Sequence, residues 1–495
     1  MKYEAVIGLE VHVQVKTKSK MFSPCGYEYG DAPNTLTDPI VLALPGTLPT
    51  INAEAVRQTV KAGMIFGCRI ASISKWDRKN YFYPDCPKNY QISQNDSPLC
   101  RGGSVEIELE GPSRNIMGEH KKIKLNRIHL EEDVGKLTHF ESESLIDYNR
   151  AGVPLMEIVS EPDMHSAAEA FAYLSSLRMH LMYAGISDCD MEKGQMRCDA
   201  NVSIRPAGQR GLGTKVELKN LNSISGVKHG IEYEIRRQRS ILDGGGTISQ
   251  ETRRWNAETC VTTLMRTKET AHDYRYFTDP DLMPVKISEE MAASVRGELP
   301  EMPFAKQERL SWLYSLPYTV TSVLCPNKIL SDYFEETVKI YQGPRTIANF
   351  IANDLLRMAG STPLETVCTR ISPQRLAELA KLVDGAAISK QSAKEIFTKM
   401  YETNDSVDAI VDKYGLRQDT NADELVGICR SVICDNTRAA SEFLAGKDQA
   451  LNVLKGKVIK ATQGKANPQL VDKVIRELLT HTLPHRPESA LEHSK

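Results

Sequence analysis

The stretch Leu9-Glu10-Val11-His12-Val13-Gln14-Val15 alternates between apolar and polar residues. Successive side chains of a β-strand point to opposite faces, so the aliphatic side chains share one face while Glu10, His12 and Gln14 share the other. The stretch therefore predicts a strand with one face in a core. A glutamate and a histidine two positions apart can converge on one metal ion or one phosphate, although a half-exposed strand with polar residues facing water has the same pattern.

The same alternation recurs in three further stretches, each with polar groups on one face. These groups are Asp199, Asn201, Ser203 and Arg205 in the first stretch, Glu217 and Lys219 in the second, and His129, Glu131 and Asp133 in the third. One mixed sheet with a carboxylate-rich face accounts for all of them. Carboxylate oxygens are the ligands that Mg²⁺ prefers, and Mg²⁺ shares its remaining positions with water and phosphate. Zinc is the less favoured metal, because histidines are few and no Cys-x-x-Cys pair is present.

Two other segments have the composition of site loops. Residues 75–85 mix cations with aromatic side chains, which suits phosphates and stacked bases, but a solvated turn with an aromatic anchor has the same composition. Residues 147–157 contain Gly152 and Pro154 before an apolar run that ends in Glu157. This second segment indicates a fixed loop that leads into a strand, or a tight turn alone.

Composition and charge exclude several classes of protein. The chain has 495 residues, 41% hydrophobic residues and a formal net charge of −2, which is ordinary for a globular protein and unlike a strongly basic nucleic-acid binder. Its 11 scattered cysteines, without a secretory segment at the start, indicate reduced thiols and a cytoplasmic location. No run of about 18 apolar residues occurs, so no membrane span is expected. Phosphate-loop, dinucleotide-turn and nucleophile-elbow motifs are also absent from the sequence.

Length and the change of pattern along the chain predict an α+β protein of about three domains. Strand patterns fill residues 1–295, and apolar residues at helical spacing fill residues 296–405. Short helices with many lysines fill residues 406–482. Residues 483–495 lack periodicity and are expected to form a frayed tail.

Short motifs that cover nearly the whole chain carry a family resemblance. They are Gly8–Gln14, Leu44–Pro49, Arg78–Asp85, Tyr90–Gln94, His129–Lys136, Asp147–Val159, Asp199–Ser203, Lys215–Ser223, Tyr274–Asp281 and Gly464–Pro468. In residue content and order they resemble GatB, the B subunit of the aspartyl/glutamyl-tRNA amidotransferases that work as the GatCAB complex.

This resemblance implies an N-terminal cradle domain with a mixed sheet, similar to the glutamine synthetase and guanidino kinase fold, then a helical domain and a small all-α tail domain. It implies that the cradle uses ATP and Mg²⁺ to phosphorylate the side-chain carboxylate of misacylated Asp-tRNA(Asn) or Glu-tRNA(Gln). Ammonia then displaces phosphate to give Asn-tRNA(Asn) or Gln-tRNA(Gln). In the implied heterotrimer, a partner amidase makes ammonia from glutamine, and a small third subunit holds the two larger ones together.

Two alternatives stay open: a carboxylate–amine ligase for a free small molecule, and a non-catalytic scaffold that binds tRNA. The face-matched acidic and imidazole groups argue against a scaffold. A basic helical tail is of no use to a ligase for small molecules.

Carried over by position, the resemblance implies the residues of the site. The implied Mg²⁺ ligands are Glu10, His12, Glu131 and Asp199. The implied catalytic set adds Glu132, Lys79, Glu217 and Lys219, and the implied ATP ligands are Lys79, Arg150, Asn201 and Arg205. For tRNA, the candidates are Lys455, Lys457, Lys460 and Lys465 in the tail, with Arg236 and Arg237 nearer the cradle.

The chain departs from the family pattern at one place. Family members often carry a Cys-Pro-x-Cys pair before the Leu-Pro-Gly motif and can hold zinc there. In this chain residues 37–42 read Thr-Asp-Pro-Ile-Val-Leu, and Cys25 stands without that pair. The sequence therefore predicts no structural zinc.

Overall fold

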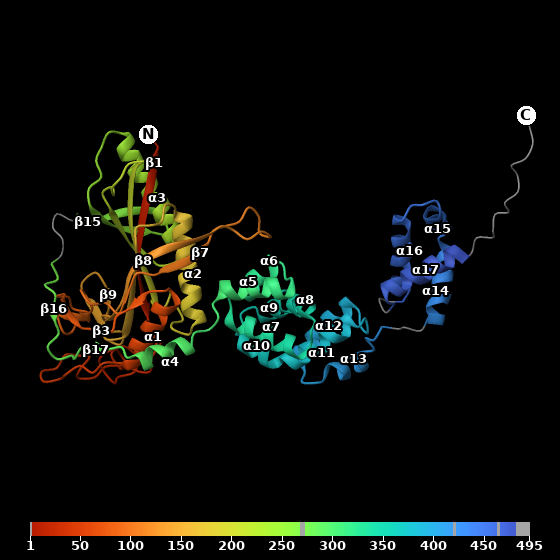
Figure 1. Cartoon of the computed structure of the whole chain (residues 1–495), viewed down its shortest axis with the longest axis horizontal. Coiled ribbons are helices and arrows are strands. Elements are labelled where there is room, and N and C mark those ends of the chain that lie inside the picture. The colour runs from red at the N-terminus through yellow and green to blue at the C-terminus, as the bar shows by residue number, and fades with distance from the viewer. Residues whose placement is uncertain (1, 268–272, 419–421, 463–465, 482–495) are drawn as a thin grey trace, which may run out of the picture. The chain divides into compact units, whose positions relative to one another are not determined.

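The computed structural model describes residues 2–267, 273–418, 422–462 and 466–481 (Figure 1). The chain divides into two compact units, Met1–Lys306 and Gln307–Lys495. The first unit has one large hydrophobic core, and the second has two smaller ones.

The first unit is built on a ten-stranded mixed sheet. Its strand order is β15-β14-β13-β12-β1-β11-β8-β6-β2, with β7 paired to β8, and its pairings are antiparallel except that of β13 with β14. The strands are β1 (Tyr3–Gln14), β2 (Arg69–Ile70), β6 (Cys100–Arg101), β7 (Ser104–Glu108), β8 (His120–Glu132), β11 (Pro154–Ser160), β12 (Met196–Pro206), β13 (Val216–Leu221), β14 (Glu251–Asn256) and β15 (Val261–Thr267). This sheet and the helices of both units agree with the expected α+β class.

β1 lies in the middle of the sheet, between β11 and β12. Leu9, Val11 and Val13 are fully buried on one face, whereas Glu10 and His12 on the other face are partly exposed. Burial of an aliphatic side chain of this kind contributes about 1.5–3 kcal/mol. Because a shift of one residue would put the carboxylate and the imidazole into the core, this burial determines the register of β1.

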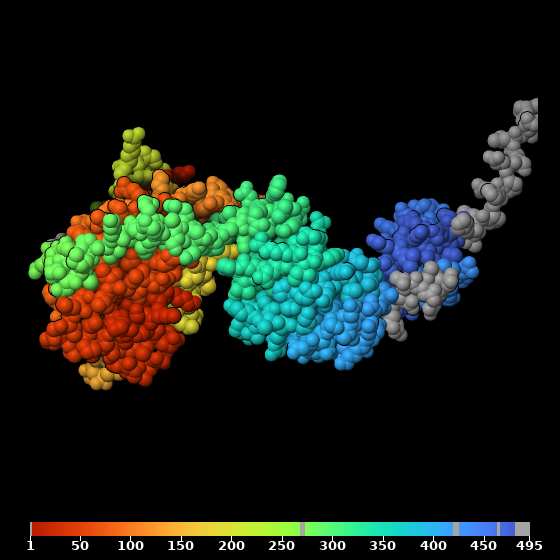
Figure 2. All heavy atoms as spheres, turned by 60° about the horizontal axis from the view of Figure 1, so that its bottom comes forward, coloured from red at the N-terminus to blue at the C-terminus, as the bar shows by residue number. Residues whose placement is uncertain are grey.

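Three helices cover the apolar face of the sheet: α1 (Ala53–Ile65), α2 (Ala167–Tyr183) and α3 (Ile224–Asp243). Each begins after an Asn or Ser side chain that accepts a hydrogen bond from a backbone N–H of the first turn. A fourth helix, α4 (Glu289–Gly297), packs on α1, and Figure 2 shows the green residues of this segment against the red N-terminal residues. The polar face of the sheet therefore points away from the core that these helices complete.

Small sheets lie beside the large one. They are β16 (Phe277–Thr278) with β4 (Asp77–Asn80) and β5 (Tyr90–Ser93), β17 (Val285–Lys286) with β3 (Ile73–Ser74), and β9 (Lys136–His139) with β10 (Ser144–Asp147). Arg78 of β4 holds the first of them together, because its Nε donates to Asp279 Oδ2 at 2.7 Å and its Nη2 donates to Asp281 Oδ2 at 2.8 Å. Ser93 Oγ of β5 donates to Glu131 Oε2 at 3.0 Å. This sheet thereby brings the end of β4 close to the polar face.

Lys20 is a buried cation that holds the segment after β1 in place. Its side chain is fully inaccessible, and its Nζ donates to Leu36 O at 2.7 Å and to Tyr148 O at 3.4 Å. Burial lowers the pKa of Lys20 to about 8, although Cys25 and Asp38 act in the opposite direction. The loop that precedes β11 is therefore tied to the N-terminal segment through one ammonium group.

We expect the wild type to gain stability relative to Lys20→Met as the pH rises from about 8 to 10.5. In the unfolded chain the lysine has its ordinary pKa, so between these values the unfolded state binds more protons and the free energy of unfolding rises with pH. The gain is at most about 3 kcal/mol, at roughly 1.4 kcal/mol per pKa unit. Denaturant unfolding below and above this window measures it. Lys16→Met, at an exposed lysine, is the control, and equal pH profiles for wild type and Lys20→Met would contradict the expectation.

The described residues of the second unit form helices and the segments that connect them, with an isolated bridge between Ile388 and Arg417. Its elements, with α5 beginning at the end of the first unit, are α5 (Pro303–Tyr314), α6 (Tyr318–Leu324), α7 (Lys328–Ile340), α8 (Pro344–Asn349), the π-helix η1 (Phe350–Leu355), α9 (Leu356–Ala359), α10 (Leu364–Arg370), α11 (Pro373–Asp384), α12 (Lys390–Glu402), α13 (Val407–Tyr414), α14 (Ala422–Asp435), α15 (Thr437–Leu444), α16 (Gln449–Ala461) and α17 (Pro468–His481). Val407 and Ile410 of α13 are buried in the core of the preceding helices, whereas α14 to α17 share a separate core.

None of the described helices combines the length and the apolar character that a bilayer span requires. The expected domain boundaries near 295 and 405, and the likeness to the glutamine synthetase and guanidino kinase fold, stay predictions. The expected frayed tail, residues 483–495, lies outside the described residues.

Candidate functional site

The register of the sheet brings reactive groups from several strands onto one face. His12 on β1 lies opposite Glu157 on β11, and Glu157 in turn lies opposite His129 on β8. On the other side of β1, Glu10 lies opposite Asp199 on β12. These groups therefore share one surface, with β1 in its middle.

His12, Glu131 and Glu157 form the group that is best placed to hold a cation. Each offers one ligand atom, and these atoms lie within 4.8 Å of one another. His12 Nε2 is 3.5 Å from Glu157 Oε2 and 3.7 Å from Glu131 Oε1. His129 borders the group, with its Nε2 3.2 Å from Glu157 Oε2. The Nδ1 atom of His129 is buried and has no hydrogen-bond partner within the described part of the chain.

Opposite charges in this group stabilise one another. Burial lowers the pKa of His129, but Glu157 and Glu131 raise it by more, to about 9. Burial also lowers the pKa of His12, and the same two carboxylates reverse this effect. For Glu131 and Glu157, burial raises the pKa, whereas Lys79 and His129 lower that of Glu131 and the two histidines lower that of Glu157, with a net decrease for both. Without a bound cation, the carboxylates are therefore ionised and favour protonated imidazoles.

Two cations border the group. Lys79 Nζ lies 3.8 Å from Glu131 Oε2, and this carboxylate is the main cause of the raised pKa of Lys79. Arg197 Nη2 donates to Asp133 Oδ2 at 2.8 Å, and Gln14 Nε2 donates to the same oxygen at 3.1 Å. Arg197 is thus paired within the sheet. Lys79 keeps its charge beside the group of His12, Glu131 and Glu157, called the metal-ligand group below, and is suited to contact a phosphate.

A second polar group lies one two-residue repeat further along β1 and β12. Asn201 Nδ2 donates to Glu10 Oε1 at 2.9 Å. Lys219 Nζ pairs with Asp199 and, at 3.0 Å, with Glu217 Oε1. Burial lowers the pKa of Lys219, but Asp199 and Glu217 raise it by more. The charges of this second group therefore largely compensate one another.

The structure regroups the metal ligands expected from the sequence. That set is Glu10, His12, Glu131 and Asp199; the structure keeps His12 and Glu131 together, adds Glu157, and leaves Glu10 and Asp199 in the second group. The physical reason is strand pairing, because the carboxylate directly across from His12 comes from β11. The signal that could have identified Glu157 is its position as the one carboxylate within the apolar run of residues 154–159.

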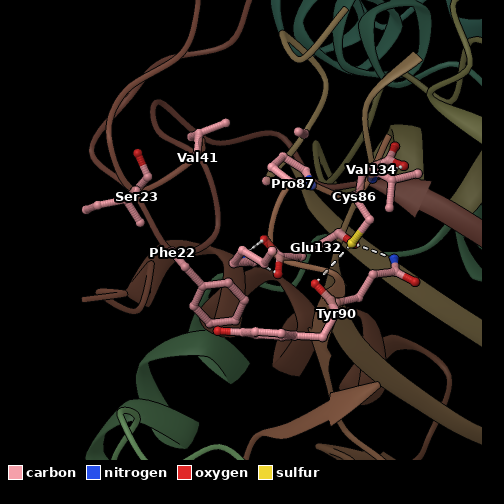
Figure 3. Close-up of a pocket in the computed structure, with 14 residues that line it drawn as sticks. Phe22, Ser23, Val41, Cys86, Pro87, Tyr90, Glu132 and Val134 are labelled. Atoms are coloured by element: carbon pink, nitrogen blue, oxygen red, sulfur yellow. Dashed lines mark hydrogen bonds and ion pairs between the residues drawn. The ribbon is translucent and has the colours of Figure 1, made fainter. Parts of the chain in front are cut away.

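Glu132, also expected in the site, points to the opposite side of β8. Its carboxylate pairs with Lys88 and accepts a hydrogen bond from Ile92 N at 2.9 Å. With Phe22 and Tyr90 it lines a separate cavity of about 20 Å³ (Figure 3), large enough for roughly one water molecule. Consecutive strand residues face opposite ways, so Glu132 cannot join Glu131 on the polar face.

A hollow of about 260 Å³ continues the polar face beyond Glu10. Its lining residues are Val6, Gly8, Leu9, Glu10, Val159, Ser160, Pro162, Asn201, Ser203, Leu212, Gly213 and Lys215. Apolar side chains and polar groups thus share one concave surface, as is typical of a site for a small organic ligand.

Two expected ATP ligands are engaged elsewhere. Arg150 donates from Nε to Val134 O at 3.0 Å and from Nη2 to Gly135 O at 2.7 Å, which stabilises the turn after β8. Arg205 Nε donates to Glu4 Oε2 at 3.1 Å. Neither residue lines the hollow, whereas the expected ligand Asn201 does.

The expected tRNA ligands near the cradle differ in their surroundings. Arg237 Nη2 donates to Glu234 Oε1 and to Glu251 Oε1, both at 2.8 Å, and Glu234 is fully buried. Arg236 is exposed on the same helix. A phosphate would have to displace two carboxylates from Arg237, so Arg236 is the better candidate.

The expected tRNA ligands of the tail are partly paired as well. Lys455 Nζ lies 2.8 Å from Asp472 Oδ1, whereas Lys457 and Lys460 are exposed. Lys465 lies outside the described residues.

The residues of the metal-ligand group fit a magnesium ion. Two buried carboxylates and one imidazole offer ligand atoms within 4.8 Å of one another. Glu131 and Glu157 also repel each other, and a divalent cation between them would relieve that repulsion. Mg²⁺ prefers such carboxylate oxygens and leaves its remaining positions to water and phosphate.

At the place where family members often hold zinc, the turn is held by hydrogen bonds. Asp38 accepts hydrogen bonds from Ser23 Oγ and, at 2.7 Å, from Val41 N. The expectation of no structural zinc stays a prediction, and metal analysis of the purified chain tests it.

The fold and this face define an enzyme component that presents a candidate divalent-cation site on a mixed sheet. A family model described as the GatB/GatE catalytic domain matches residues 5–293, and another described as the GatB domain matches residues 332–479. The chain is 59% identical to the aspartyl/glutamyl-tRNA(Asn/Gln) amidotransferase B subunit of Opitutus terrae, over 97% of this chain and 99% of that protein. It is 49% identical to the B subunit of Methylacidiphilum infernorum and 48% identical to that of Thermoanaerobacter pseudethanolicus, over 97% of this chain and 100% of either protein. The chain therefore belongs to the family of aspartyl/glutamyl-tRNA amidotransferase B subunits, which are ligases of translation.

Proposed function

We propose that the first unit uses ATP and Mg²⁺ to phosphorylate the side-chain carboxylate of an aspartate or glutamate carried by tRNA, and then joins ammonia to it. The main supporting observation is the group of His12, Glu131 and Glu157, which can hold a divalent cation beside Lys79. The substrate class comes from the names of the relatives, which are aspartyl/glutamyl-tRNA(Asn/Gln) amidotransferases.

The chemistry explains why such a group is needed. A carboxylate is a poor electrophile for ammonia, because its leaving group would be oxide. Attack of a carboxylate oxygen on the γ-phosphorus of ATP releases ADP and forms an acyl phosphate. Attack of ammonia on the carbonyl carbon then releases phosphate. Both steps depend on positioning and on neutralised phosphate charge, and neither needs a nucleophile from the protein.

The metal-ligand group and the neighbouring lysines have different tasks in this proposal. Glu131, Glu157 and His12 would hold Mg²⁺, which would supply positive charge to the phosphate oxygens. Lys79 contacts the phosphoryl group from the side of β4. Lys219 stays a candidate contact for phosphate or for the path of ammonia.

The hollow beyond Glu10 is the proposed place for the nucleoside of ATP. Its volume of about 260 Å³ suits a base and a ribose, and the walls formed by Val6 and Val159 offer apolar contact to a flat ring. Asn201 and Lys215, on the same surface, are suited to the ribose and to phosphate. Because the hollow adjoins Glu10, the triphosphate would extend along β1 toward His12.

Two features favour this function over the alternatives. A scaffold that only binds tRNA has no need for two ionised carboxylates beside paired imidazoles in a buried group. The chain matches relatives over nearly its full length, and the names of these relatives specify a tRNA substrate. A ligase for free small molecules would not be expected to have such relatives.

We infer that the chain acts in the cytoplasm as one component of a heterotrimer. The relatives are designated B subunits, which implies further subunits. A partner amidase would supply ammonia from glutamine, since no amidase motif is present in this sequence. A small third subunit would complete the assembly.

Removal of the last helices should weaken tRNA binding. Because α13 packs in the core before it, the cut is best placed after Gln418, which removes α14 to α17 with Lys457 and Lys460. Loss of phosphate contacts is expected to reduce tRNA affinity about 10-fold or more at moderate salt and to flatten its salt dependence. Filter binding measures this, and glutamine hydrolysis by the partner amidase is the control that should stay unchanged. Equal tRNA affinity of both forms would contradict a tail interface.

The proposed function is tested with the full chain purified together with its partner subunits. Misacylated Asp-tRNA(Asn) and Glu-tRNA(Gln) are each incubated with ATP, Mg²⁺ and either glutamine or ammonium, and amide formation and ADP release are measured. Amide formation that requires ATP, Mg²⁺ and charged tRNA is the expected result. The proposal would be overturned by amide formation without ATP, or by ADP release at the same rate with and without charged tRNA.

A further inference from the structure

Four tyrosine rings lie between an exposed turn and the metal-ligand group. The rings of Tyr83 and Tyr81 are stacked, with centroids 5.5 Å apart and planes 22° apart. Tyr274 and Tyr276 meet edge to face, with centroids 5.9 Å apart. Lys79 Nζ lies 5.3 Å from the centroid of Tyr274 and connects these rings to Glu131 as described above. We refer to Tyr81, Tyr83, Tyr274 and Tyr276 as the tyrosine row.

The backbone that carries the tyrosine row is held by specific hydrogen bonds. Asn80 N donates to Tyr274 O at 3.0 Å, and Asn80 Nδ2 donates to Arg275 O at 2.7 Å. Arg275 has a φ of +47°, a conformation that costs energy for a residue with a side chain. The two aromatic segments are therefore fixed side by side, at some local cost, next to the end of β4.

These aromatic side chains are unusually accessible. Tyr81, Tyr83 and Tyr276 expose 37%, 47% and 37% of their surface, and Phe82 exposes 75%. Aromatic rings of globular proteins are mostly covered, and a contiguous exposed group of them marks an interaction site. Flat rings beside a lysine are the composition that binds unpaired nucleotides, because bases stack on the rings and the cation attracts the phosphates.

The covalent structure of an aminoacyl-tRNA indicates which nucleotides would bind to the tyrosine row. In an aminoacyl-tRNA the amino acid is an ester of the terminal ribose, so one ribose and one amino acid separate the last base from the reacting carboxylate. When that carboxylate lies at Glu131 and Glu157, the last base lies within reach of the rings next to Lys79. We propose that the tyrosine row stacks the unpaired 3′-terminal nucleotides of the tRNA and thereby positions the amino acid. This inference rests on the proposed function, because the substrate class comes from it.

The adenine of ATP is the other purine that could use the same rings. The hollow lined by Val159 and Asn201 already offers ATP a place on the opposite side of the metal-ligand group. The tyrosine row is therefore assigned to the tRNA, and the experiment separates the two sources of a purine.

The test uses the full chain in complex with its partner subunits and a tRNA that carries 2-aminopurine as its last base. Stacking quenches the fluorescence of this base analogue, so binding to the wild type should quench it. Tyr81→Leu and Tyr276→Leu keep apolar bulk but lose the ring, and they should lose most of the quenching. Tyr81→Phe and Tyr276→Phe keep the ring and should retain it. We expect kcat/KM for charged tRNA to fall roughly 10- to 100-fold in the Leu variants, with recovery in the Phe variants.

Tyr414→Leu, at an exposed tyrosine of α13, is the matched control and should behave as the wild type. Quenching that is absent, or equal in wild type and Leu variants, overturns the inference. So does a Leu variant that weakens ATP binding while the tRNA end stays quenched. The quenching can be measured without ATP, so it is independent of the chemistry. If quenching depends on the rings but ATP-dependent amide formation fails, the proposed chemistry is rejected and the stacking is not.

Discussion

Glu157→Gln should lower the rate of amide formation at least about 100-fold, while the protein stays folded. The substitution keeps the size of the side chain and removes one of the two buried negative charges beside His12. The cation then loses a ligand charge, and His12 and His129 lose the carboxylate that compensates them. Amide formation with ammonium in place of glutamine measures the effect without the partner amidase.

The Mg²⁺ dependence distinguishes a lost ligand from general damage. The concentration of Mg²⁺ needed for half-maximal rate should rise in Glu157→Gln, and high Mg²⁺ should restore part of the activity. Glu161→Gln, just beyond β11 and hydrogen-bonded to Asn126, is the control and should be nearly as active as the wild type. A Glu157→Gln variant that is active and has a normal Mg²⁺ dependence would show that Glu157 is not a ligand of the cation.

Lys79→Met should lower the rate of amide formation to a comparable extent, but it should not weaken the binding of Mg²⁺. Loss of the ammonium removes positive charge from the transferred phosphoryl group, for which we expect a decrease of kcat of about 100- to 1,000-fold. Glu131 then loses the lysine that lowers its pKa, but it keeps its place in the metal-ligand group. The affinity for Mg²⁺ should therefore stay the same or increase slightly, which single-turnover rates at several Mg²⁺ concentrations can measure.

Lys75→Met is the control for this prediction. Lys75 lies in the same segment but pairs with Asp77 and Asp96 instead of the polar face. A normal rate in Lys75→Met with a strong loss in Lys79→Met is expected. If both variants lose activity equally, the loss reflects the folding of β4 and not phosphate binding.

Alternation along a sequence predicts the faces of strands but not their neighbours. The strands that carry Glu10, His12, Glu131 and Asp199 follow from period-two patterns, and the structure places all four residues on one face. Alternation says which side of a strand a residue occupies, but it says nothing about which strand lies next to it. Alternation therefore did not identify Glu157 as a candidate ligand, because its place beside His12 depends on the pairing of β1 with β11.

Resemblance to a family has the opposite weakness. It selected Glu132 with Glu131, although neighbouring strand residues face opposite sides and Glu132 pairs with Lys88. It also selected Arg150, and the clustering of arginines near the cradle selected Arg237, although the guanidinium groups of both have partners within the first unit. A motif match identifies a segment, whereas the environment of each side chain decides its role.

The central place of β1 has a consequence for how the molecule is made. β1 leaves the ribosome well before both of its neighbours, because β11 and β12 are synthesised far later in the chain. Both edges of β1 stay unpaired in the nascent polypeptide until residue 160 has emerged, and one edge stays unpaired until residue 206 has emerged. An apolar strand with an unpaired edge is prone to aggregate. Expression of this protein should therefore depend on chaperones that shield β1 during translation.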